Sequence, residues 1–150
     1  MKTFSDRGLL RYLLDTNILS AIVKQPAGLL AQRIAALSRE TFCTSIVVAS
    51  ELRYGTYRKG SAKLTVQVEK VLAGVDILAL EEPVDHHYGS IRAELERIGQ
   101  PIGHNDLFIA AHARALGLTL VTANLGEFSR VPGLSVENWL ENSAKTVLNV

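Results

Sequence analysis

Short apolar runs alternate with longer amphipathic segments along almost the whole chain, and this alternation limits the fold more than any other feature. The short runs predict strands at residues 12–14, 41–44, 75–80, 119–122 and 135–136. The longer segments predict helices at 18–23, 29–38, 46–57, 64–72, 83–98 and 106–116. Strands that alternate with helices predict an α/β layered fold with a mostly parallel sheet.

Length and composition exclude several classes of protein. The 150 residues make one domain, 1–150, with its motifs between about 11 and 140 and a polar tail at 140–150 that we expect to fray. A single cysteine, Cys43, cannot form an internal disulfide, which fits a reducing compartment. We find no secretion signal and no apolar run long enough to span a membrane, so we expect a cytoplasmic protein. A net charge of +1 means that any nucleic-acid binding must depend on a local basic patch.

Three carboxylates fall where a parallel sheet would gather them. Asp15 follows the first predicted strand, Glu51 lies in the helix after the second, and Asp106 opens the most apolar helix. Each has an ordinary explanation: Asp15 and Asp106 as helix caps, and Glu51 as a surface side chain. Together they predict a cleft at the carboxyl ends of the strands, where α/β sheets bind ligands.

Carboxylates this close would repel one another, by about 4 kcal/mol for two charges 4 Å apart at an effective dielectric of 20. A divalent cation would remove that repulsion, as would a carboxyl group that stays protonated. Oxygen ligands without a supporting His or Cys pair indicate Mg²⁺, with Mn²⁺ as a substitute, rather than Zn²⁺. Such a site suits hydrolysis of a phosphodiester.

The residues around these carboxylates resemble the motifs of PIN-domain ribonucleases, and their order and spacing resemble those of VapC-type toxins of toxin–antitoxin pairs. Any one motif is short, but four in order are specific, and the resemblance covers about residues 11–140. The matching segments are Leu13–Asn17, Ser50–Gly55, Ile102–Ala111 and Val121–Asn124, the last followed by Glu127–Phe128 and Val131–Leu134.

The resemblance implies a PIN-like three-layer α/β/α sandwich and a Mg²⁺-dependent endoribonuclease. Asp15, Glu51 and Asp106 would take the metal-site positions, with Asn124 at the fourth position of the catalytic site. The implied substrate is RNA, with the initiator tRNA cut in its anticodon stem-loop. The implied partners are a second copy of the chain and a VapB-type antitoxin, whose tail occupies the groove beside the active site.

Asn124 departs from the family pattern, because many members have Asp at this position. An amide can bind a metal or a water but supplies no charge, which favours one metal ion over two. Glu127 could substitute for it, or could simply be exposed. Thr16, Asn17 and Thr122 could bind water or phosphate, or serve only in caps and turns.

A basic cluster follows Glu51 and could contact phosphates while its tyrosines stack on bases. It could equally be a solvated helix end with packed tyrosines, and contact with the antitoxin that the resemblance implies competes for the same surface. The cluster consists of Arg53, Arg58, Lys59 and Lys63 with Tyr54 and Tyr57. Two rival functions remain open at this point. One is a PIN-like module that binds RNA or protein without cutting; the other is a small-molecule phosphatase, which would need a second acid where Asn17 stands.

Overall fold

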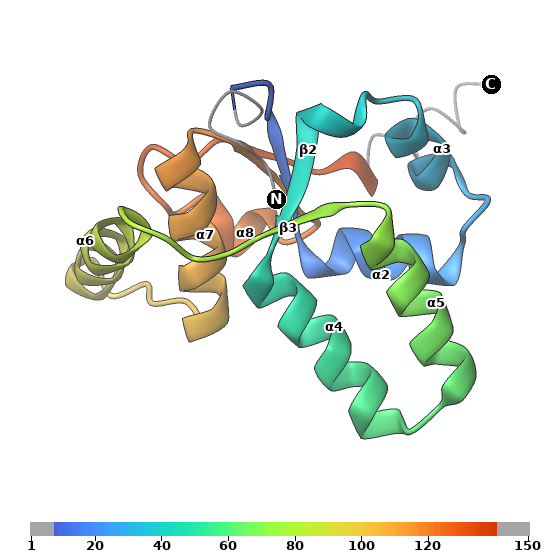
Figure 1. Ribbon diagram of the computed structural model, residues 1–150. Coiled ribbons are helices and arrows are strands. Elements are labelled where there is room, and N and C mark those ends of the chain that lie inside the picture. Colours follow the sequence, from blue (N-terminus) through green and yellow to red (C-terminus); the bar gives the residue numbers. More distant parts are fainter. Residues whose placement is uncertain (1–7, 141–150) are drawn as a thin grey trace.

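The computed structural model describes residues 8–140, and its centre is a five-stranded sheet in which every strand is parallel to its neighbours (Figure 1). The strand order is β3-β2-β1-β4-β5, so the first strand of the chain lies in the middle. This confirms the predicted α/β class. The strands are β1 (Tyr12–Leu14), β2 (Phe42–Ser45), β3 (Asp76–Leu78), β4 (Thr119–Val121) and β5 (Val136–Glu137).

Helices cover both faces of the sheet and complete the three layers that the resemblance implies. In Figure 1, α6 and α7 lie to one side of the strands and α2, α3 and α5 to the other, while α4 extends from the end of β2. The helices are α2 (Thr16–Lys24), α3 (Leu29–Ala35), α4 (Ile46–Lys59), α5 (Ala62–Ala73), α6 (Val84–Arg97), α7 (His104–Leu116) and α8 (Leu125–Phe128). A 3₁₀ turn, Arg39–Thr41, precedes β2.

Several predicted boundaries are wrong by a few residues, for local reasons. Helix α2 begins two residues earlier than predicted, because Asp15 caps it by accepting a hydrogen bond from the Thr16 amide. Thr41 closes the 3₁₀ turn by bonding back to Ser38, so β2 starts one residue later than predicted. Pro83 lies at the cap of α6 rather than inside its first turn.

Other boundaries also differ. Helices α5 and α7 each begin two residues earlier than predicted, whereas α3 ends three residues earlier. The third and fourth strands are shorter than predicted, and β5 is shifted by one residue. Helix α8 was not predicted, since four residues are too few to show a helical period. Ser45 caps α4 by accepting a hydrogen bond from the Val47 amide, and Gly117 ends α7 in the left-handed conformation.

The core fills the space between the central strands and α7. Leu14 of β1 and Leu120 of β4 are completely buried, as is Ile109 of α7. Burying each such side chain stabilises the fold by roughly 1.5–3 kcal/mol. Because Ala110 and Ala111 are also fully buried and small, α7 can pack closely, which holds its first turn near the carboxyl ends of the strands.

No helix among residues 8–140 has the length and hydropathy needed to cross a membrane. We expected the tail at residues 140–150 to fray. From residue 141 onward this tail lies outside the described part of the chain.

Candidate active site at the carboxyl edge of the sheet

Asp15 is the most buried carboxylate of the site, and three donors hold it. Its Oδ1 accepts from the Thr16 amide at 2.8 Å. Its Oδ2 accepts from the Thr122 hydroxyl at 2.8 Å and from Asn17 Nδ2 at 3.3 Å. Burial raises the pKa of Asp15, while these hydrogen bonds act in the opposite direction. Asp15 is therefore both a helix cap and a carboxylate fixed at the edge of the sheet.

The polar residues near Asp15 tie the ends of β1 and β4 together. Asn17 Oδ1 accepts from the Ala123 amide at 2.9 Å, across the gap between these strands. The Thr122 hydroxyl also accepts from the Asn124 amide at 3.0 Å. Thr122 and Asn17 thus position Asp15, a role more specific than the turn formation that sequence allowed.

Glu51 reaches the same place from α4. Its Oε1 accepts a hydrogen bond from the Thr16 hydroxyl at 3.0 Å, which brings it next to Asp15 on α2. Burial raises the pKa of Glu51, and the negative charge of Asp15 adds to the effect. Glu51 is therefore not a surface residue.

Asp106 has the most perturbed carboxyl group of the site, with a pKa raised to about 7. Burial in the first turn of α7 is the largest cause, followed by a hydrogen bond with Glu127 and by the negative charges of Asp15, Glu127 and Glu51. Four carboxyl groups thus influence one another at this edge.

Asn124 and Glu127 occupy the fourth side of the site, at the start of α8. Asn124 Nδ2 donates to Glu127 Oε2 at 3.1 Å. Asn124 lines the pocket, whereas the half-buried Glu127 contacts it only through Asn124 and Asp106. That Asn124, rather than Glu127, serves at the fourth position of the catalytic site stays a prediction, which these contacts favour.

A pocket of about 510 Å³ lies over these groups, and it brings the sequence-predicted residues together. Asp15, Glu51, Asp106 and Asn124 all line it. Ser20 and Lys24, which sequence reasoning missed, line it as well. Their signal was the spacing of four residues from Thr16 to Ser20 to Lys24, which places all three on one face of α2.

The donor set fits Mg²⁺ better than a metal that needs a full protein cage. Within residues 8–140, no three Asp, Glu, His or Cys side chains are arranged to hold one ion among them. Mg²⁺ usually keeps several waters and takes only one or two carboxylates directly. The buried, fixed carboxylate of Asp15 and the raised pKa of Asp106 indicate an acidic site that a cation would stabilise.

Comparison with known proteins places the chain in a family. The model of the PIN domain family matches residues 12–134, which include all four of the motifs described above. The chain belongs to the PIN-domain family. Haemophilus influenzae "Ribonuclease VapC2" is 39% identical over 134 residues, covering 88% of this chain and all of that protein.

Two further matches fall in the same branch of PIN domains. Shigella flexneri "tRNA(fMet)-specific endonuclease VapC" is 38% identical over 132 residues, covering 87% of this chain and 99% of that protein. The crystal structure of VapBC2 from Rickettsia felis, bound to a DNA fragment from its promoter, superposes with a TM-score of 0.81 at 34% identity. The superposition covers 87% of this chain and 98% of the matched Rickettsia chain. The chain is thus a VapC-type PIN domain, and its fold is the PIN three-layer sandwich.

Proposed function

We propose that this PIN domain is a Mg²⁺-dependent endoribonuclease toxin that hydrolyses RNA phosphodiester bonds in the cytoplasm. Its proposed substrate is the initiator tRNA, cut in the anticodon stem-loop, in line with the name of the Shigella relative. Its proposed inhibitor is a VapB-type antitoxin, as the VapBC complexes among its structural relatives suggest. We also propose that it forms a homodimer.

The observation that carries the proposal is the pocket where Asp15, Glu51 and Asp106 meet without a basic partner for any of them among the described residues. A bound Mg²⁺ would offset this charge, lower the pKa of a coordinated water and stabilise the negative charge on the phosphate. Asp15 and Asp106, with Glu51, would hold the ion, in part through water.

The residues of the chain have separate tasks in this scheme. Thr122 and Asn17 orient Asp15 and favour its ionised form by donating to it. Thr16 orients Glu51 through its hydroxyl. Asn124, whose Nδ2 already donates to Glu127, lines the same pocket and would offer its amide to a water or a phosphate oxygen.

The reaction is attack of water on phosphorus with cleavage of the P–O3′ bond. The water loses a proton to the carboxylate cluster, and the departing 3′ oxygen gains one. The products are a 5′-phosphate and a 3′-hydroxyl. Attack by a ribose 2′-hydroxyl would instead give a cyclic phosphate, so the product ends test the mechanism.

The decisive experiment incubates the purified protein, free of antitoxin, with total bacterial tRNA and Mg²⁺, and sequences the cut ends. We expect discrete cuts in one tRNA that disappear with EDTA and with Asp15→Asn. We also expect Asp106→Asn to abolish growth arrest when the toxin is expressed in cells. Cleavage that persists in EDTA would refute the metal, and growth arrest by Asp106→Asn would favour the module that binds without cutting.

A further inference from the structure

A second pocket, of about 520 Å³, lies between α2, α4 and α5 and continues from the acidic pocket. The two share the side chains of Thr16, Ser20, Lys24 and Glu51. A polymeric substrate whose scissile bond lies over Asp15 and Asp106 can therefore extend directly into the second pocket.

Three basic side chains line this second pocket: Lys24 at the end of α2, and Arg58 and Lys59 in the last turn of α4. All three are exposed, and none forms an ion pair or a side-chain hydrogen bond with any residue in the range 8–140. Their positive charges are available to a ligand.

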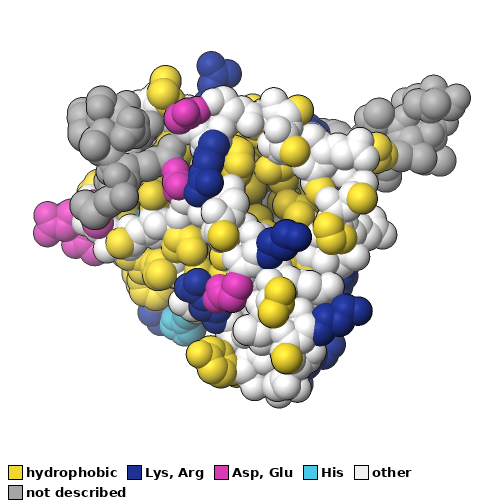
Figure 2. Space-filling view, turned by 45° about the vertical axis from the view of Figure 1, so that its right-hand side comes forward, with side chains coloured by type: hydrophobic (Ala, Val, Ile, Leu, Met, Phe, Trp, Pro, Cys, Tyr) yellow, Lys and Arg dark blue, Asp and Glu magenta, His cyan; other side chains and the backbone are white. Residues whose placement is uncertain are grey.

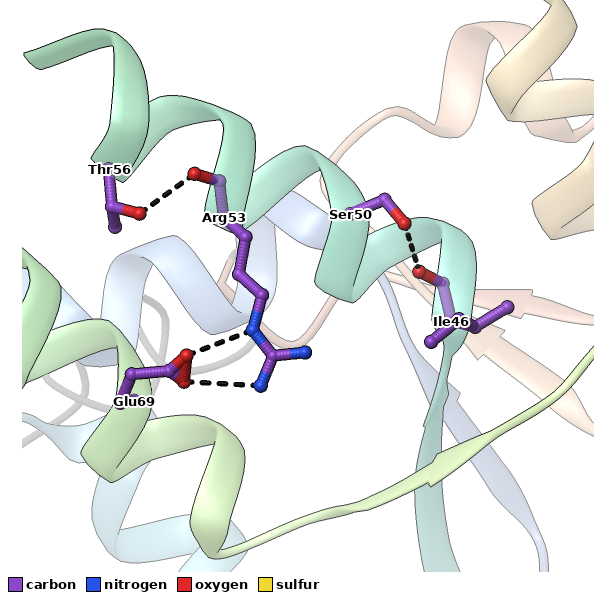
Figure 3. A network of polar contacts seen from close by, with 5 residues as sticks. All are labelled: Ile46, Ser50, Arg53, Thr56 and Glu69. Atoms are coloured by element: carbon purple, nitrogen blue, oxygen red, sulfur yellow. Dashed lines mark hydrogen bonds and ion pairs between the residues drawn. The ribbon is translucent and has the colours of Figure 1, made fainter.

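The nearby Arg53, by contrast, is neutralised by an ion pair. Arg53, one turn before Arg58, donates to both carboxylate oxygens of Glu69 on α5, at 2.9 and 3.1 Å (Figure 3). Figure 3 shows its side chain extended toward α5. The basic cluster predicted from sequence is therefore divided, with Arg53 structural and Arg58 and Lys59 free. The expectation of packed tyrosines is wrong, since Tyr54 and Tyr57 are 66% and 86% exposed.

The floor between the cations is apolar and open. Val23, Leu52, Leu64 and Val68 form it. Gly55 lies on the same side of α4 as Glu51, and a Cβ added there would meet nothing within 4 Å. A flat, partly apolar group such as a nucleobase can lie on this surface while its phosphate meets a cation at the rim.

We propose that this pocket is the track of the RNA strand on one side of the cleaved bond, with Lys24, Arg58 and Lys59 contacting successive backbone phosphates. The inference rests on the proposed ribonuclease function. Lys24 contacts the phosphate next to the acidic pocket, because it lines both pockets. The occupant is RNA because the track begins where the phosphodiester must bind, and because beyond Glu51, which belongs to the acidic site, every charged side chain that lines it is positive.

The first test measures binding of a labelled tRNA(fMet) transcript in EDTA, as a function of salt, for Lys24→Gln and for Arg58→Gln with Lys59→Gln. One lost phosphate contact should lower the slope of log affinity against log salt by about 0.7, which is about fivefold in affinity at 0.1 M salt. Lys24→Arg should retain the wild-type slope, since it keeps the charge. Lys63→Gln is the matched control: Lys63 is exposed on α5, lines neither pocket, and should change nothing beyond a small effect of net charge.

The second test measures cleavage of the same tRNA with Mg²⁺. Loss of a contact made equally in substrate and transition state raises KM and leaves kcat unchanged, so Lys24→Gln should raise KM about fivefold. Gly55→Leu should also raise KM, by filling the track, while urea unfolding shows a fold at least as stable as wild type, because leucine favours a helix more than glycine does.

Three outcomes would overturn the proposal. One is an unchanged salt slope and unchanged KM in both basic variants, which would leave the pocket to an acidic protein segment. Another is a fall in kcat alone for Lys24→Gln, which would place Lys24 on the reacting phosphate. The third is an equal loss in Lys63→Gln. Failure of the wild-type protein to cut any tRNA would instead count against the proposed function.

Discussion

Replacing Asp106 with asparagine should stabilise the metal-free protein, although it removes a residue of the candidate active site. In the folded protein the pKa of Asp106 is raised from 3.8 to about 7 by burial and by neighbouring carboxylates. An acid whose pKa is higher in the folded state binds its proton more tightly there than in the unfolded chain. Folding stability therefore falls as the pH rises from about 4 to about 7, and is constant above that.

The size of the effect follows from the shift. About three pKa units at 1.36 kcal/mol each would give about 4 kcal/mol at most. Asp106 is only half-buried, so solvent screening reduces this, and the positive end of α7 favours its charge. We expect Asp106→Asn to gain about 2 kcal/mol over wild type at pH 8, and much less near pH 4.

Urea unfolding followed by circular dichroism, in EDTA and at a series of pH values, measures this difference. Asp85→Asn is the matched control, because Asp85 is also in the first turn of a helix but is exposed and outside the pocket. It should lose a few tenths of a kcal/mol, about 0.3, at every pH above 5.

Mg²⁺ should reverse the order of the two proteins. At a hundred times its dissociation constant, a ligand specific for the folded state adds about 2.7 kcal/mol. Wild type should gain this and Asp106→Asn should gain much less. Two results would refute the reasoning. One is an Asp106→Asn protein that is less stable than wild type in EDTA at pH 8. The other is a difference in the free energy of unfolding between the two proteins that does not vary with pH.

Three further changes test the site and the core. Thr122→Val removes a hydrogen bond to the buried Asp15 carboxylate and should lower the free energy of unfolding by about 2 kcal/mol in urea titrations at pH 7. Asn124→Asp replaces the donor to Glu127 with a charge, so calorimetry should show tighter Mg²⁺ binding while the metal-free protein loses about 1 kcal/mol. Ile109→Ala leaves a cavity in the completely buried face of α7 and should lower the free energy of unfolding by about 3 kcal/mol.

Matched variants set the scale for two of these changes. Thr44 donates to the Leu14 carbonyl, a neutral acceptor, so Thr44→Val should lower stability by only about 1 kcal/mol. A larger loss than in Thr122→Val would contradict the special role of the Asp15 carboxylate. Ile46 is 39% exposed, so Ile46→Ala should lower the free energy of unfolding by less than Ile109→Ala does, with a difference of at least about 1 kcal/mol.

A face of the protein apart from the active site also carries exposed apolar surface. Between α2, α3 and α5 lies a pocket of about 420 Å³, whose lining includes the partly exposed Ile22, Leu37 and Val71. Figure 2 shows this side hollowed, with hydrophobic side chains in its floor and basic side chains around it.

The class of fold and the identity of the acidic residues follow from local patterns in the sequence. Alternating apolar runs and amphipathic segments are local patterns, and they predicted β1, α4 and α7 to within a few residues. The order of four short motifs indicated the family before any geometry was known, and Asp15, Glu51 and Asp106 do line one pocket.

The tertiary structure decided which side chains act together. Asp15 and Thr122 are 107 residues apart, and they meet only because β1 lies between β2 and β4 in the sheet. The pairing of Arg53 with Glu69 depends on how α4 packs against α5, so sequence could not separate it from the free Arg58. A helical period shows which residues share a face, but only the packed neighbours decide whether that face meets a carboxylate, a pocket or solvent.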